Sequence, residues 1–224
     1  MESTLRLGIG LATLSLVVGC APINRQIDHW ALGAMAGIAQ RPLAARDPVP
    51  LPFSTREELE QLTRPDGVPE VTVGPSPRRI PDVRLVQEQV SFPSAVKLRL
   101  PETNTAVAQV FRRGPLGKRP VVVWVPGQAI SDGDWESLQT YFNGVLDAGC
   151  DVVLYVPPYH LERTPPGLGS GDAMLATDFA DHLGVFAQEV SDLRRLSVWL
   201  RAQGVRSLGA FGSSMGGGML LRTV

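Results

Sequence analysis

The sequence lacks an excess of charge of either sign. Its 224 residues carry 21 Lys and Arg against 22 Asp and Glu, and 44% of them are hydrophobic. These values are typical of a globular protein and argue against a disordered or polyanion-binding chain. The basic residues are scattered apart from one cluster at 112–119. This cluster lies between two strand-like runs, so we expect it to form a solvated turn. We therefore expect no nucleic-acid partner.

A long hydrophobic run is also missing. Near the N-terminus, the apolar residues 7–18 are too few to span a hydrocarbon core of ~30 Å as a helix. They follow Arg6 and end in Leu-Val-Val-Gly-Cys at 16–20, so residues 1–20 are predicted to be a targeting segment. The alternatives are a plain signal peptide or a buried first helix with an incidental cysteine.

The end of this segment resembles the lipobox of bacterial lipoproteins. The resemblance implies that Cys20 becomes an acylated N-terminus that anchors the protein to a membrane of the bacterial cell envelope. Ala21 stands where an aspartate would imply retention at the inner membrane. The implied location is therefore the outer membrane, facing the periplasm.

Cysteine is scarce, since only Cys150 remains once Cys20 is assigned to the lipid anchor. A single cysteine excludes a disulfide scaffold and a thiolate metal site. Cys150 precedes a strand-like apolar run, so we expect it to be a small buried apolar residue.

Residues 21–82 are predicted to form a proline-rich tether that packs partly on the domain after it. Short helices are expected at 30–39 and at 54–62, the second capped by Ser54 or Thr55 ahead of acidic residues. Proline removes backbone donors and stops helices, so the segment cannot be regular throughout. From residue 40 to residue 82 the prolines lie at positions 42, 48, 50, 52, 65, 69, 75, 77 and 81.

From residue 83 onward the pattern predicts an α/β domain. Three alternating runs joined by short turns suit antiparallel strands, and a continuous apolar run at 120–125 suits a strand buried on both faces. Helices and strands then alternate, with connections long enough for parallel pairing. The expected strands are 83–92, 95–100, 105–112, 120–125, 151–156 and 205–211; the expected helices are 135–148 and one or two within 172–203, ending at Gly204.

The last predicted strand runs into Gly-Ser-Ser-Met-Gly at 212–216, which has the spacing G-x-S-x-G. A serine on a sharp strand-to-helix turn projects its hydroxyl above a sheet, and Gly212 and Gly216 let neighbouring segments pass closely. A phosphate-binding loop would need a lysine, and none follows Lys118. A dinucleotide-binding turn would follow an early strand instead. The motif therefore predicts that Ser214 is a nucleophile.

Residues 83–224 resemble the α/β-hydrolase superfamily. The resemblance includes the Ser-Met-Gly-Gly sequence of the elbow, which is the strand-to-helix turn at 212–216, and the Pro-Pro-Tyr turn at 157–159. It also includes the turn Pro126-Gly127-Gln128 after an apolar strand, although the family usually has His-Gly at that turn. It implies an α/β-hydrolase-like fold, with a mostly parallel central sheet flanked by helices. It also implies a serine hydrolase that acts on small-molecule esters, or less readily amides, without a cofactor.

The predicted roles follow from acyl-transfer chemistry. Ser214 would attack a carbonyl carbon, and backbone N–H groups would stabilise the oxyanion. One donor would be the N–H of Met215 at a helix N-terminus, where the dipole favours an anion. The other would come from the turn containing Gly127, at the N–H of Gln128.

The partners of Ser214 are not evident. In the family the acid and the histidine follow the serine, whereas His29, His160 and His182 all precede it. We assign His160 to packing of its loop or to substrate contact rather than to the general base. The sequence is therefore expected to be a truncated domain with little activity alone. The alternative is a non-catalytic envelope lipoprotein that retains the hydrolase scaffold.

A metal site is not expected. Asp132 and Asp134 have the spacing of calcium ligands, but the start of a helix accounts for both as caps.

Overall fold

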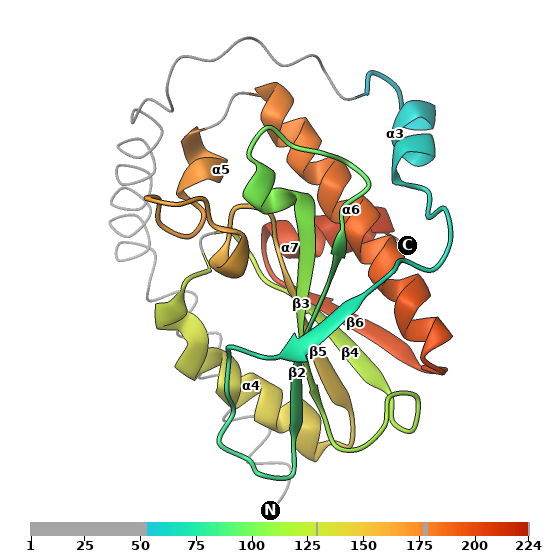
Figure 1. Ribbon diagram of the computed structural model, residues 1–224, viewed down its shortest axis with the longest axis vertical. Coiled ribbons are helices and arrows are strands. Elements are labelled where there is room, and N and C mark those ends of the chain that lie inside the picture. The colour runs from blue at the N-terminus through green and yellow to red at the C-terminus, as the bar shows by residue number, and fades with distance from the viewer. Residues whose placement is uncertain (1–52, 129, 177–178, 224) are drawn as a thin grey trace, which may run out of the picture. The chain divides into compact units, whose positions relative to one another are not determined.

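The computed structural model describes residues 53–128, 130–176 and 179–223, which are drawn in colour in Figure 1. The predicted targeting segment with Cys20, the helix expected at 30–39 and His29 lie outside the described residues. The chain divides into two units, residues 1–42 and 43–224, and all described residues belong to the second. Of the helices in these described ranges, none is both long enough and apolar enough to cross a bilayer.

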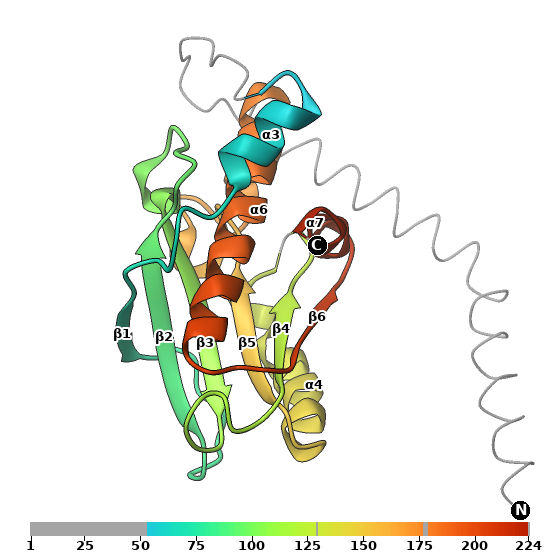
Figure 2. The same ribbon diagram turned by 90° about the vertical axis from the view of Figure 1, so that its right-hand side faces the viewer.

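In the described ranges, one sheet of six strands has the order β1-β2-β3-β5-β4-β6, which can be followed from left to right in Figure 2. Three antiparallel pairings, β1 with β2, β2 with β3 and β3 with β5, are followed by two parallel pairings of β4 with β5 and β6. The sheet is thus mixed. The strands are β1 (Thr72–Pro75), β2 (Val86–Pro93), β3 (Thr105–Arg112), β4 (Val121–Val125), β5 (Asp151–Val156) and β6 (Leu208–Gly212).

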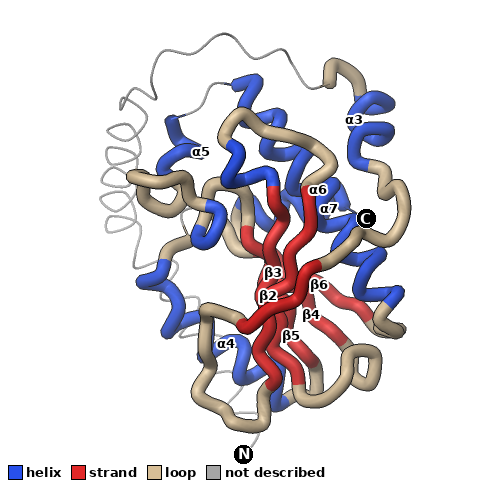
Figure 3. The backbone as a smooth tube through the Cα atoms, in the orientation of Figure 1, coloured by secondary structure: helices blue, strands red, loops and turns tan. Residues whose placement is uncertain are grey.

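Helices cover both faces of the sheet (Figure 2 and Figure 3). Helix α4 (Trp135–Asp147) lies on one face, whereas α6 (Phe179–Ala202) and α7 (Met215–Thr223) lie on the other. The short α5 (Asp172–Ala176) precedes α6, and α3 (Arg56–Thr63) packs against α6.

The alternation of side chains along β4 explains the two-sided core. Val121, Val123 and Val125 pack toward α6 and α7, whereas Trp124 packs toward α4. All six residues of β5 are buried, as expected for a strand covered on both faces. The continuous apolar runs at 120–125 and 151–156 therefore predicted the centre of the sheet correctly.

The ends of several helices follow the predicted capping signals. Helix α3 begins with a capping box, in which the Glu58 N–H donates to Thr55 Oγ1 at 3.1 Å and the Thr55 N–H donates to Glu58 Oε2 at 3.2 Å. Helix α6 stops at Gly204, where the Gly204 N–H donates to the Arg201 carbonyl at 2.9 Å. The predicted helical region 172–203 is resolved into α5 and α6.

Two predictions differ from the structure. The segment 95–100 is not a strand, because the Asn104 side chain occupies the backbone N–H and C=O of Leu98, at 2.6 and 2.9 Å, in place of a neighbouring strand. The sheet also begins before residue 83: β1 lies within the segment expected to be a tether and pairs with β2. Strand β1 is short, lies at the sheet edge and ends at Pro75, so its sequence carried little strand signal.

Candidate active site

The turn between β6 and α7 carries Ser213 and Ser214. Strand β6 ends at Gly212 and α7 begins at Met215, so only two residues reverse the chain direction. Ser214 has φ +49°, in the left-handed region, and its side chain is exposed. A non-glycine residue in this region signals local strain that surrounding contacts must hold in place. The predicted strand-to-helix turn is therefore present, with the serine at its apex.

The two glycines of the motif are required by close backbone contacts. A Cβ atom on Gly216 would lie 2.4 Å from the carbonyl oxygens of Val125 and Pro126, and one on Gly212 would lie 2.7 Å from the backbone of Gly216. Contacts this short are sterically forbidden for a side chain. Glycine at 216 therefore lets the turn pack against the end of β4, and glycine at 212 lets the turn close against the start of α7.

The turn at Pro126, Gly127 and Gln128 touches the elbow directly. Because β4 and β6 are parallel neighbours, with Val125 opposite Gly212, both turns leave the same edge of the sheet. The Gly127 N–H donates to Ser213 Oγ at 3.1 Å, and the Ser213 N–H donates to the Val125 carbonyl at 3.2 Å. A Cβ on Gly127 would lie 3.1 Å from the Ser214 Cβ.

The predicted oxyanion donors come from these two touching turns. Met215 is the first residue of α7, and its N–H has no intrahelical acceptor because the first turn of any helix leaves its amides unpaired. Gln128 follows Gly127 and lines the same pocket as Ser214. The structure thus brings Ser214, Met215, Gly127 and Gln128 together at one edge of the sheet.

A pocket of about 500 Å³ opens beside Ser214. Its wall is aromatic: the Trp124 ring lies 4.2 Å from the Phe211 ring and 5.7 Å from the Tyr141 ring, centroid to centroid. Phe211 and Tyr141 are about half exposed. The lining residues come from β4 and its turn, from α4 and its start, and from β6 and the elbow: Trp124, Pro126, Gly127, Gln128, Ile130, Asp134, Ser137, Leu138, Tyr141, Phe211, Ser213 and Ser214.

Neither described histidine lines this pocket. His160 is fully buried, with Nδ1 2.7 Å from the Pro158 carbonyl oxygen, and burial lowers its pKa. His182 lies in α6 and is partly buried. His160 therefore packs its own loop, which is one of the two roles expected for it.

The two aspartates before α4 have structural partners. Asp134 Oδ2 accepts hydrogen bonds from the Ser131 N–H at 2.8 Å and from the Ser131 hydroxyl at 2.9 Å, which completes a capping box for the short 3-10 turn Asp132–Asp134. The Asp134 side chain does not cap α4 itself, as the sequence had suggested. Asp132 forms an ion pair with Arg78 at 2.9 Å. Within the described ranges, no group of three or more His, Cys, Asp or Glu side chains is arranged to hold a metal ion.

Sequence reasoning missed a buried polar cluster behind the loop that follows β5. The Arg163 guanidinium is fully buried and bonds to the Tyr155 hydroxyl and the Val156 carbonyl, both at 3.0 Å, and to Gln188 Oε1 at 2.8 Å. Its Nη2 lies 3.2 Å from Asp192 Oδ2. The partners lie far apart in sequence, so a lone arginine in a loop gave no signal of its burial.

The loop held by Arg163 also reaches the elbow. Tyr159 is buried in an apolar cluster against which Met215, the residue after Ser214, is packed. Tyr159 and Leu161 have φ +66° and +47°, so this loop, like the elbow, contains non-glycine residues in the left-handed region.

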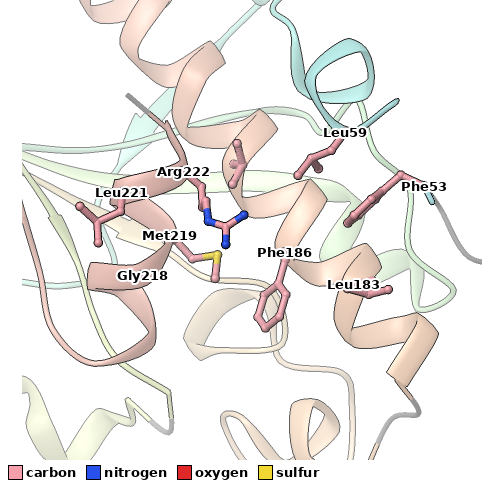
Figure 4. A pocket seen from close by; sticks show the side chains of 9 residues that line it. Phe53, Leu59, Leu183, Phe186, Gly218, Met219, Leu221 and Arg222 are labelled. Atoms are coloured by element: carbon pink, nitrogen blue, oxygen red, sulfur yellow. The ribbon is translucent and has the colours of Figure 1, made fainter. Parts of the chain in front are cut away.

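A second pocket, of about 520 Å³, lies between α3, α6 and α7 (Figure 4). It is mostly apolar, and the side chains of Met219 and Phe186 point toward the space between α7 and α6. Ser214 does not line it, and neither does any acid, histidine or cysteine: its lining residues are Phe53, Leu59, Leu183, Phe186, Val190, Gly218, Met219, Leu221 and Arg222. The candidate active site is therefore the pocket beside the elbow.

No protein-family model matches the sequence, and no curated protein matches it. Among solved structures, a candidate acetyl xylan esterase from Bacteroides fragilis is similar, with 16% identity and a TM-score of 0.52, over 74% of this chain and 47% of that one. Acetyl xylan esterase 1 from Thermoanaerobacterium also matches, with 17% identity and a TM-score of 0.46, over 76% of this chain and 59% of that one. A glucuronoyl esterase from Solibacter usitatus matches with 14% identity and a TM-score of 0.48, over 75% of this chain and 54% of that one.

The chain spans about half to three fifths of the length of these esterases. At such low identity the likeness concerns the fold. The mixed sheet flanked by helices, together with the match to the Bacteroides fragilis structure, defines an α/β-hydrolase-like fold.

Proposed function

We propose that this protein is a serine hydrolase that cleaves small-molecule carboxylic esters through an acyl-enzyme. The observation that carries the proposal is the left-handed φ of +49° at Ser214, in a turn that touches the Gly127 turn and borders the pocket. The esterase names of the structural neighbours agree with it.

The proposed reaction begins when Ser214 Oγ attacks the carbonyl carbon of the ester. A general base removes the hydroxyl proton, the carbonyl π electrons move to its oxygen, and the N–H groups of Met215 and Gln128 stabilise the resulting oxyanion. The oxyanion collapses, the C–O bond to the alcohol breaks, and the base returns the proton to the leaving alcohol. Water then hydrolyses the acyl-serine by the same steps, which frees the carboxylic acid.

The general base is proposed to come from outside these 224 residues. Neither described histidine lines the pocket, and the chain covers only part of the esterases that it matches. Without a base, the serine remains a neutral alcohol and loses an acceleration of roughly 10²–10⁴-fold. We therefore propose that residues 1–224 alone have little or no activity.

A fluorophosphonate probe tests the nucleophile in protein expressed from its complete reading frame. We expect labelling of the wild type, loss of labelling in Ser214→Ala and retained labelling in Ser213→Ala, because only Ser214 is proposed to be activated. Labelling that persists in Ser214→Ala would overturn the assignment. Absence of labelling in the wild type would favour the alternative, a non-catalytic envelope protein that retains the scaffold.

We also propose that Cys20 anchors the protein by lipid to the bacterial cell envelope, at the outer membrane and facing the periplasm. The support is the lipobox-like sequence at 16–20. Wild-type protein should partition with membranes, and Cys20→Ser should be released into the soluble fraction. Equal partitioning of the two proteins would remove the anchor from the proposal.

A further inference from the structure

We propose that Ser213 is a positioning residue. Its hydroxyl holds the oxyanion turn, that is, the turn Pro126-Gly127-Gln128 with the proposed Gln128 donor, at the correct position relative to the nucleophile Ser214. The inference rests on the proposed function, because an oxyanion turn has meaning only in an acyl-transfer site. The motif G-x-S-x-G does not specify the residue before the nucleophile, so the motif itself predicts no role for Ser213.

The two turns are joined by a pair of hydrogen bonds that both involve Ser213. Its N–H donates to the Val125 carbonyl at the end of β4, at 3.2 Å, and its hydroxyl oxygen accepts the Gly127 N–H, at 3.1 Å. Ser213 therefore contacts the end of β4 through its backbone and the turn after β4 through its side chain. Of these two links, only the second can be removed by a side-chain substitution.

Packing sets the distance between the two turns, but it does not set the orientation of the Gly127 peptide. Gly127 has no side chain, and the nearest atoms to its hypothetical Cβ are the Ser214 Cβ at 3.1 Å and the Ser213 carbonyl oxygen at 3.3 Å. Both distances are shorter than an ordinary van der Waals contact, so the two turns approach closely here, but such contacts are non-directional and do not orient the Gly127 peptide. The hydrogen bond from Gly127 to Ser213 is thus the specific restraint on the orientation of its peptide plane.

This restraint has a consequence for the neighbouring amide. Because the Gly127 N–H is directed at Ser213, it is not directed at a substrate carbonyl in the pocket. The next amide along the turn, that of Gln128, belongs to a residue that lines the pocket. Fixing the Gly127 peptide therefore leaves the Gln128 N–H as the donor that this turn offers to an oxyanion.

Ser213 itself does not fit the role of nucleophile. Its hydroxyl oxygen is engaged by an amide, and Ser214, not Ser213, has the left-handed φ. The close-packed glycines, Gly212 and Gly216, are placed symmetrically about Ser214. The geometry thus separates the two adjacent serines into a reacting and a positioning group.

The test compares Ser213→Ala with Ser213→Thr, which keeps the hydroxyl, in protein expressed from the complete reading frame with p-nitrophenyl acetate as substrate. We expect the alanine variant to lower kcat about 10-fold with KM changed less than about twofold, since a displaced donor acts on the transition state. Threonine should restore most of kcat. Ser197→Ala, which removes a hydroxyl bonded to the Leu193 carbonyl within α6, is the matched control and should leave kcat unchanged.

Two results would overturn the inference: an unchanged kcat in Ser213→Ala, or a threonine variant as slow as the alanine variant. Retained activity in Ser214→Ala would instead overturn the proposed function, so the two failures are distinguishable. A measurement without activity gives a second test in residues 1–224. The Gly127 amide should exchange with solvent at least several-fold faster in Ser213→Ala than in the wild type, and equal exchange rates would contradict the proposed hydrogen bond.

Discussion

The turns that follow β5 and β6 leave the same edge of the sheet, but different interactions hold them. The elbow after β6 is fixed by backbone contacts, which the absence of side chains at Gly212 and Gly216 makes possible. The loop after β5 is fixed by a fully buried guanidinium, that of Arg163, which bonds both to strand β5 and to helix α6. One turn is held by close approach and the other by buried charge.

This difference has consequences for sensitivity to substitution and to pH. The backbone contacts of the elbow are broken when a methyl group is added at Gly212 or Gly216, but they do not depend on pH because no titratable group takes part in them. The charge cluster behind the β5 loop depends instead on the protonation states of the Asp192 and Glu189 carboxyls, which lie near the Arg163 guanidinium. Three sets of experiments follow, from the largest expected effect to the smallest.

Arg163→Met should have the largest effect on stability. The substitution leaves the Asp192 carboxylate, which lies 3.2 Å from the guanidinium, buried without its counter-charge. Breaking one side of a buried ion pair costs about 3–5 kcal/mol in the free energy of unfolding. Urea unfolding of the purified chain measures this loss.

The matched control is the same substitution at an exposed ion pair. Arg84 lies 2.9 Å from Asp82, but 70% of its side-chain surface is exposed, so Arg84→Met should change the free energy of unfolding little. If Arg163→Met and Arg84→Met lowered the free energy of unfolding equally, burial of the Arg163 ion pair would not be what stabilises the loop after β5.

Glu189 should make the stability of the chain depend on pH. Its carboxyl is fully buried, both oxygens have no hydrogen-bond partner, and burial raises its pKa to about 8, although Arg163 opposes this rise. The folded chain therefore binds more protons than the unfolded chain between about pH 4.5 and 8. Stability must fall as pH rises through this window, by about a few kcal/mol.

Glu189→Gln removes the titrating group with little change in shape. The difference between wild-type and variant unfolding curves isolates Glu189 from His160, whose lowered pKa acts with the opposite sign below about pH 6.5. We expect the wild type to lose stability from pH 5 to 9 relative to the variant. Parallel curves would mean that Glu189 is already ionised at pH 5.

The elbow is tested by two alanine substitutions in α7. Gly216→Ala places a Cβ 2.4 Å from two carbonyl oxygens, so it should destabilise the chain by about 1–3 kcal/mol and separate the elbow from the Gly127 turn. Gly218→Ala meets no atom within 4 Å and should stabilise the helix by about 0.5–1 kcal/mol. Thermal midpoints that move in the same direction would contradict the steric account.

The elbow could be predicted from sequence because its determinants are local. The glycines and serine lie within five residues, and the strand before them and the helix after them have their own periodic patterns. The same holds for the central strands β4 and β5, whose apolar runs are continuous, and for the end of α6 at Gly204. At these positions, local preference and the tertiary environment agree.

The Arg163 cluster, β1 and the segment 95–100 could not be predicted in this way. The cluster joins Arg163 to Ser94 and Asp192, which are separated by tens of residues, and no local pattern marks an arginine as buried. Strand β1 forms because β2 offers it a free edge, in spite of Pro75. The segment 95–100 alternates like a strand, but Asn104 bonds its backbone instead.

The contact between Gly127 and Ser213 joins positions 86 residues apart, which dictates an order of events during synthesis. At ribosomal rates of about 5–20 residues per second, roughly 4–17 s separate the emergence of these two residues. Throughout this interval, one hydrogen-bonding edge of β4 has no neighbour, since β6 has yet to be made. Until β6 is made, the nascent chain therefore exposes a strand edge that the finished fold pairs.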